Sequence, residues 1–114
     1  MKVVKRRQAV RDIDEHAAFI ASHDPSAAFR FLEMVEETFE LPARHPRIGS
    51  LRFGHVVSGL RAIPVKAFHS YVVLYLVTAG RWVTAGRAQV IRIAHAAQDL
   101  EALLKGPWTE PRRS

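Results

Sequence analysis

The chain has 114 residues, of which 48% are apolar, so we expect one domain with a modest hydrophobic core. It contains no cysteine, which excludes a disulfide scaffold and a cysteine-ligated zinc site and suits a reducing compartment. Residues 1–7 show no secretory signal, and residues 71–77, the longest apolar run, are too few to cross a bilayer. We therefore expect a cytoplasmic protein with no membrane partner.

The net charge of +6 is distributed unevenly along the chain. Residues 1–40 hold six Lys/Arg against eight Asp/Glu, whereas residues 41–98 hold eight Lys/Arg and no carboxylate. A block of uncompensated positive charge favours a polyanionic partner, either a nucleic acid or an acidic protein segment. The alternative is a basic surface that only keeps the protein soluble.

The N-terminal part predicts a short strand at residues 2–5 followed by two helices. From Gln8 the apolar side chains recur at helical spacing, with Asp12, Asp14 and Glu15 outside the apolar stripe of Val10, Ile13, Ala17 and Ile20. Asp24 and Pro25 are a helix cap and a first-turn residue, and they start a second helix that ends before Pro46. Its expected buried face comprises Ala28, Phe31, Leu32, Val35 and Phe39. The short connection predicts an antiparallel hairpin of the two helices.

The rest of the chain predicts a β-meander and a final helix. Residues 45–59 are rich in Gly, Pro and Ser and predict a loop, with an edge strand at 52–57 as an option. Residues rich in β-branched and aromatic side chains predict strands at 60–66, 71–78 and 88–95, and helical spacing returns at 96–105. The predicted fold class is therefore α+β. It has an antiparallel sheet of three or four strands, a helical hairpin packed on one face, and a short C-terminal helix. Residues 1–106 form its single domain, and 107–114 are expected to be a flexible tail.

A six-residue repeat falls inside the last predicted β-hairpin. Residues 77–82 and 83–88 share the sequence Val-Thr-Ala-Gly-Arg. We interpret the repeat as a local duplication that lengthens the hairpin into an arm carrying Arg81, Trp82 and Arg87. A binding role for this arm is the alternative to a neutral insertion.

Alternation along the strands assigns side chains to the two faces of the sheet. Val72, Leu74 and Leu76 form a purely aliphatic set, which we expect to lie under the helical hairpin. The opposite, open face is then predicted to show Tyr71, Tyr75, Arg92 and Lys66. Aromatic rings among cations suit an acidic amphipathic peptide. The alternative for both tyrosines is an ordinary core position.

Three segments of the chain resemble the ParE branch of the ParE/RelE toxin superfamily. They are DPSAAFRFLEMVEETFELPARHPRIG (24–49), GLRAIPVKAFHSYVVLY (59–75) and IRIAHAAQDLEALL (91–104). The resemblance extends over about residues 2–105. The chain departs from the family pattern at Ala96, where a glycine is common, and in the interval between Tyr75 and His95, which is longer by one copy of the repeat.

The resemblance implies a toxin of a type II toxin–antitoxin operon. ParE-like toxins block DNA gyrase, whereas RelE-like relatives cut mRNA on the ribosome. The partner implied is a small ParD-like antitoxin whose acidic segment binds the toxin in a hetero-oligomer. For this contact we nominate Lys66, Tyr71, Tyr75, Arg92 and Arg61, with Arg61 at a sheet edge near the terminal helix. Arg92 is expected to contribute more to it than Arg44, which follows the second helix.

The residues equip the chain poorly for RNA cleavage. Metal-free cleavage needs a base, cations for the phosphate and an acid, yet residues 41–98 contain no glutamate. If the chain were an endonuclease, its candidates would be His95, Arg61 and Arg92; a junction histidine that only makes hydrogen bonds is the alternative for His95. Neither metal-ligand spacing nor a phosphate-binding glycine loop is present, so we expect no metal and no cofactor. We favour a gyrase inhibitor that acts by binding over direct nucleic-acid binding. An mRNA endonuclease and a decayed toxin that only binds its antitoxin stay open as alternatives.

Overall fold

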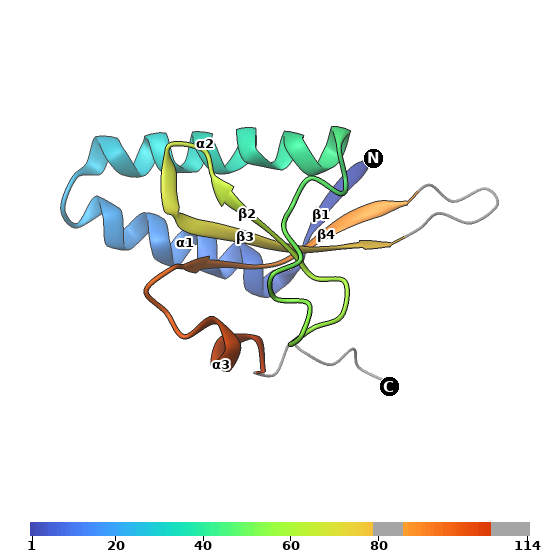
Figure 1. Ribbon diagram of the computed structural model, residues 1–114. Helices are drawn as coiled ribbons and strands as arrows, with labels where there is room; N and C mark the ends of the chain where they lie inside the picture. The colour runs from blue at the N-terminus through green and yellow to red at the C-terminus, as the bar shows by residue number, and fades with distance from the viewer. Residues whose placement is uncertain (79–85, 106–114) are drawn as a thin grey trace.

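A computed structural model of the protein describes residues 1–78 and 86–105, which form four strands and three helices (Figure 1). In chain order these are β1 (Lys2–Lys5), α1 (Arg7–Ala21), α2 (Pro25–Arg44), β2 (Arg61–Val65), β3 (Phe68–Thr78), β4 (Arg87–His95) and α3 (Leu100–Leu104). The α+β class and the order of elements agree with the sequence prediction. The predicted arm with Arg81 and Trp82 and the predicted tail at 107–114 lie outside the described residues.

The four strands form one mixed sheet in the order β1-β4-β3-β2. The meander β2-β3-β4 is antiparallel as predicted, but β1 pairs with β4 in parallel. The expectation of a purely antiparallel sheet therefore needs this correction. Local sequence patterns identify β1 as a strand but hold no information about its partner, because that pairing joins the two ends of the fold.

The helical hairpin is built as its sequence signals predict. Asp24 caps α2 by accepting a hydrogen bond from the Ala27 N–H at 3.2 Å, and Pro25 occupies the first turn. That backbone hydrogen bond, followed by one from Ser26, lowers the pKa of the Asp24 carboxyl. α1 and α2 lie together on one side of the sheet, and α3 lies on the other (Figure 1).

Both faces of the sheet are buried, each in its own hydrophobic core. Phe31 and Val35 of α2 pack with Val73, Tyr75 and other residues between the hairpin and the sheet. The opposite face is covered by residues of the 51–59 loop and of α3. Its core comprises Leu60, Ala62, Val72, Leu74, Ile91, Ala94 and Leu104.

The predicted assignment of the two sheet faces is wrong. Tyr71 and Tyr75 are 7% and 0% exposed and belong to the core under the hairpin, whereas Val72 and Leu74 lie on the opposite face. Alternation specifies which residues share a face, but it does not say which face meets the helices. The aliphatic set packs instead against α3 and the 51–59 loop. The sequence prediction had assigned no packing role to either segment.

Smaller differences have local causes. Residues 52–57 form turns rather than an edge strand, and the loop pairs with β2 only through the bridge of Ser50 with Ala62. α3 is shorter than predicted because Asp99 caps it by accepting from the Ala102 N–H. Val10 and Leu32, predicted to be buried, are 43% and 37% exposed.

Candidate partner-binding groove

The buried hydroxyl of Tyr75 holds the loop that follows α2 against the sheet. It accepts a hydrogen bond from the Gly49 N–H and donates one to the Pro46 carbonyl oxygen, both at 2.9 Å. Burial raises the pKa of Tyr75 above the ordinary tyrosine value. Gly49 is required here because a Cβ atom would lie 2.9 Å from the tyrosine oxygen. The tyrosine thus positions the loop and is not itself on the surface.

Arg61 fastens the same loop from the edge strand β2. Its Nη1 donates to the carbonyl oxygens of Arg47 at 3.0 Å and Gly49 at 2.9 Å. The prediction of a sheet-edge position for Arg61 is confirmed. Its hydrogen bonds go to the loop after α2 rather than to the terminal helix, which lies against the opposite face of the sheet.

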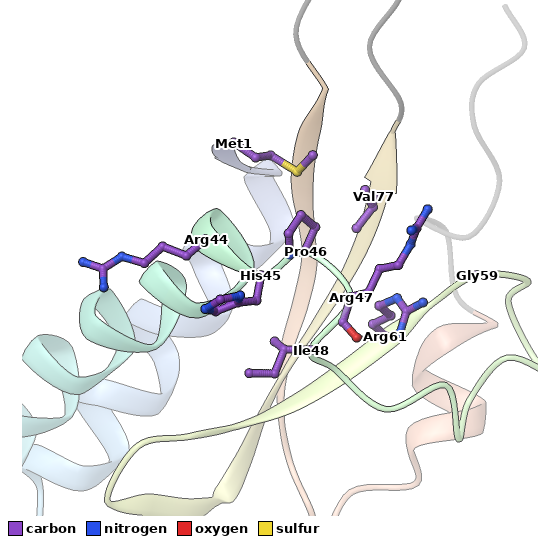
Figure 2. Close-up of a pocket in the computed structure, with 9 residues that line it drawn as sticks. All are labelled: Met1, Arg44, His45, Pro46, Arg47, Ile48, Gly59, Arg61 and Val77. Atoms are coloured by element: carbon purple, nitrogen blue, oxygen red, sulfur yellow. Dashed lines mark hydrogen bonds between the residues drawn. The ribbon is translucent and has the colours of Figure 1, made fainter.

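A groove of about 1080 Å³ opens beside this fastened loop (Figure 2). Its apolar lining consists of Met1, Pro46, Ile48 and Val77, and its polar side chains are Arg44, His45, Arg47 and Arg61. The amino group of Met1 donates to the Ala43 carbonyl oxygen at 2.8 Å, which brings the first residue to the end of α2. The groove therefore joins the chain start, the end of α2 and two strands, segments far apart in sequence.

The groove is electropositive because its arginines find little compensation. None of the described residues that line it carries a carboxylate. Arg44 pairs with Glu40 at 3.3 Å, but both side chains are largely exposed, so this pair contributes little. Within residues 1–78 and 86–105 no salt bridge involves Arg47 or Arg61. Figure 2 shows Arg44 pointing away from Arg47 and Arg61, so the charges lie at opposite sides of the groove.

Arg92 does not lie on an open face, contrary to prediction. It makes two hydrogen bonds to Asp12 of α1, Nε to Oδ2 at 2.7 Å and Nη2 to Oδ1 at 2.9 Å. The Arg92 side chain is 13% exposed and the Asp12 side chain is 4% exposed. Asp12 was expected outside the buried stripe of its helix, and its buried carboxylate is instead the partner of this arginine.

Asp12 and His16 together complete the edge of β4 beyond the end of β1. The N–H of Ile93 donates to Asp12 Oδ2 at 3.0 Å, and His16 Nε2 donates to the Ile93 carbonyl oxygen at 2.8 Å. Residues at i and i+4 on α1 thus take the place of a neighbouring strand. Arg92 and these two residues act together to hold α1 against the sheet.

Lys66 and His95 lie apart from the groove. Lys66 Nζ pairs with Glu37 of α2 at 2.9 Å in an exposed position. His95 accepts a hydrogen bond from the Ala97 N–H through Nδ1, and its ring meets the Tyr71 ring edge-on at 4.8 Å. This is the geometry of a junction histidine. Antitoxin contact by Lys66, Tyr71, Tyr75, Arg92 and Arg61 stays a prediction, and of these only Arg61 lines the groove.

The endonuclease candidates are not brought together. Tyr71 is opposite His95 and Tyr75 is opposite Arg61, so the histidine and this arginine are about 13 Å apart along β3 alone. The guanidinium of Arg92 is occupied by Asp12. In the described part of the chain no cluster of acidic or histidine side chains has the arrangement of a metal site. None of its helices is long and apolar enough to cross a membrane.

The sequence analysis missed most of the groove. The signal was available at residues 44–48, Arg-His-Pro-Arg-Ile, where an isoleucine follows two arginines in a loop without carboxylates. Ile48 lies in a predicted loop, so no helical or strand periodicity accounts for an apolar side chain at this position. Met1 and Val77 carried no comparable signal.

Comparison with known proteins identifies relatives of the whole fold. The family model described as the ParE toxin of the type II toxin-antitoxin system, parDE, matches residues 3–100. A solved structure titled "Chromosomal ParDE TA system from P. aeruginosa" matches with a TM-score of 0.65 at 18% identity, covering 83% of this chain and 95% of that one. Among curated proteins no relative matches.

Proposed function

Since the chain belongs to the ParE toxin family of type II toxin–antitoxin systems, we propose that it stops DNA replication by binding and inhibiting DNA gyrase. A cognate ParD-like antitoxin with an acidic segment neutralises it in a hetero-oligomer in the cytoplasm. The toxin acts as a binding inhibitor and needs no cofactor.

The observation that carries the proposal is the groove beside residues 45–49. In the part of the chain that the structure describes, its lining has apolar surface between arginines and contains no carboxylate, and these are the properties of a site for an acidic protein segment. Within the superfamily that the chain resembles, ParE-like members act on gyrase and RelE-like members cut mRNA. The separation of His95 from Arg61, and the pairing of Arg92 with Asp12, favour the first activity.

Two measurements test the target. The purified chain is added to DNA gyrase and relaxed plasmid, and we expect supercoiling to be inhibited in proportion to the toxin added. Inducing the chain in bacteria should stop DNA synthesis and trigger the DNA-damage response while bulk mRNA stays intact. Primer-extension cuts at codons within minutes of induction would overturn the proposal in favour of the endonuclease.

A His95→Ala variant separates the two activities. Under the proposal it inhibits gyrase like the unmodified chain, after correction for any change in folded fraction. Loss of codon cuts in this variant would instead assign the histidine to catalysis. A chain that binds the antitoxin but leaves growth, gyrase and mRNA unaffected is a decayed toxin, and this result also contradicts the proposal.

A further inference from the structure

We propose that the chain binds double-stranded DNA through a basic surface at one end of the β-sheet. This basic sheet surface comprises Lys2 of β1, Arg6 directly after it, and Arg87 and Gln89 of β4. It contacts the phosphate backbone and does not read the bases. Its role, holding the toxin on the DNA that gyrase processes, rests on the proposed function, whereas the DNA contact itself does not.

The two residues from the start of the chain lie on the face of the sheet opposite the helical hairpin. Val3 packs against the core under the hairpin, and Lys5 pairs with Glu36 of α2. Lys2 and Arg6 alternate with these two residues and therefore point away from the hairpin.

The same alternation holds in β4. Ala88 and Val90 belong to the core under the hairpin, so Arg87 and Gln89 lie on the other face. The core on that face includes Ile91 but neither Arg87 nor Gln89. Figure 1 shows α3 beside the end of β4 rather than its start. The start of β4 and the adjoining β1 are therefore not covered by α3.

Two cations of this surface are direct neighbours across the sheet. Lys2 is paired in register with Arg87, and both residues are exposed. Adjacent strands are about 4.8 Å apart, and like charges that face each other at this spacing repel. Among the described residues, neither cation takes part in a salt bridge. An anion bound between them relieves a repulsion that the chain itself leaves uncompensated.

Arg6 is positioned without being neutralised. Its Nε and Nη2 donate to the Gln89 side-chain oxygen at 3.1 Å and 2.8 Å. An amide oxygen carries no net charge, so the guanidinium keeps its full positive charge and its Nη1 donors. The hydrogen bonds hold the side chain along the sheet, which lowers the conformational entropy lost when a phosphate binds.

The sequence on either side of the surface is free of carboxylates. Residues 1–11 hold five Lys/Arg and no Asp/Glu, and residues 86–95 hold two arginines and no Asp/Glu. The parallel pairing of β1 with β4 brings these two segments together. Their summed charge favours a polyanion and speeds its association.

The arrangement fits the backbone of a DNA duplex. Lys2 and Arg6 are four residues apart in extended backbone, a separation of about 13 Å. Phosphates of one DNA strand recur about every 3.4 Å along the helix axis, so both cations reach the same backbone.

Other polyanions fit this surface less well. A single-stranded nucleic acid is held largely by stacking on aromatic rings, and none of the four residues of the surface is aromatic. An acidic protein segment brings apolar side chains that need apolar surface. Here Val4 is half-buried, and Leu76 already packs against the core that α3 covers.

Fluorescence anisotropy of the full-length chain with a short labelled DNA duplex tests the contact. Three phosphate contacts predict that the logarithm of the binding constant falls with the logarithm of the salt concentration with a slope of about −2.7. Arg87→Gln should weaken binding and reduce the magnitude of this slope by about 0.9. Arg87→Glu should weaken binding further. Its melting temperature should not fall, because the glutamate is then in register with Lys2.

The matched control is Arg30→Glu, which makes the same change in net charge. Arg30 is exposed on α2, and its guanidinium lies 5.8 Å from the centre of the Phe68 ring, away from the basic sheet surface. We expect Arg30→Glu to weaken DNA binding much less than Arg87→Glu does. Equal weakening by the two variants would mean that the chain attracts DNA only through a diffuse field, which overturns the inference.

Competitors identify the class of polyanion. Single-stranded RNA of the same length and poly-glutamate are added to the DNA complex at equal concentrations of negative charge. We expect both to displace the duplex less effectively than unlabelled duplex does. If either displaces it more effectively, the surface is not a DNA site.

The gyrase supercoiling assay separates this inference from the proposed function. A chain that inhibits gyrase but does not bind the duplex overturns the inference and leaves the proposed function standing. A chain that binds the duplex through Arg87 but does not inhibit gyrase overturns the proposed function and leaves the DNA contact standing. If both hold, Arg87→Glu should also inhibit gyrase less than Arg30→Glu does.

Discussion

Asp12 and Arg92, eighty positions apart in the chain, form an ion pair of two hydrogen bonds that links α1 to β4. The carboxylate is 4% exposed and also accepts the Ile93 N–H. Together with His16, this pair holds the first helix at the part of β4 that β1 does not reach. It is therefore a structural contact.

Asp12→Ala should destabilise the protein by about 3–5 kcal/mol, because it leaves the guanidinium of Arg92 buried without a counter-charge. Urea unfolding followed by circular dichroism measures this loss. Asp14→Ala, on the same helix at an exposed position, is the control and should change the free energy of unfolding by less than about 0.5 kcal/mol. Equal effects of the two substitutions would mean that the buried pair contributes nothing specific.

Tyr75→Phe should cost about 1–3 kcal/mol, because the buried Gly49 N–H loses its hydrogen-bond partner. The same change should loosen the loop at residues 46–49 and accelerate amide exchange there. Tyr71→Phe is the matched control. Tyr71 is also buried, but its hydroxyl makes no hydrogen bond within the described residues. The role of Tyr75 in fastening the loop is refuted if both variants unfold at the same urea concentration.

The two tyrosines should also make the fold sensitive to alkali. Burial raises the pKa of both Tyr71 and Tyr75, and they are the chain's only tyrosines. A raised pKa in the folded state means that the stabilisation is complete below the unfolded value, about 10, and is lost as the pH rises through the folded value. Tyrosinate absorbance should therefore appear at higher pH in the native protein than in urea. Coincident titration curves would contradict the prediction.

Ala67→Gly should stabilise the protein by about 0.5–1 kcal/mol. Ala67 lies in the two-residue turn between β2 and β3 with φ at +64°, a conformation that costs an L-residue about 1–2 kcal/mol and glycine almost nothing. The entropy that glycine adds to the unfolded chain offsets part of this gain. Thermal unfolding gives the difference. Ala97→Gly, at an exposed turn residue whose φ is not positive, should instead be slightly destabilising.

The sequence by itself determined the elements and their order. Asp24 and Pro25 start α2 where predicted, the β-branched runs became β2, β3 and β4, and three motifs were sufficient to indicate the ParE family. These features depend on residues close together in the chain. Helix capping, strand composition and motif spacing are local properties, so they can be predicted from the sequence without knowledge of the fold.

Only the tertiary structure decided which face of the sheet the hairpin covers and what each cation contacts. Alternation in β3 is the same whichever face is turned to the helices, so Tyr75 and Leu74 were interchangeable until the packing of α3 was known. The partner of Arg92 is on a helix eighty residues earlier, and the groove joins Met1, Ile48 and Val77. Such long-range pairings are established by the packing of the whole chain, and no local pattern records them.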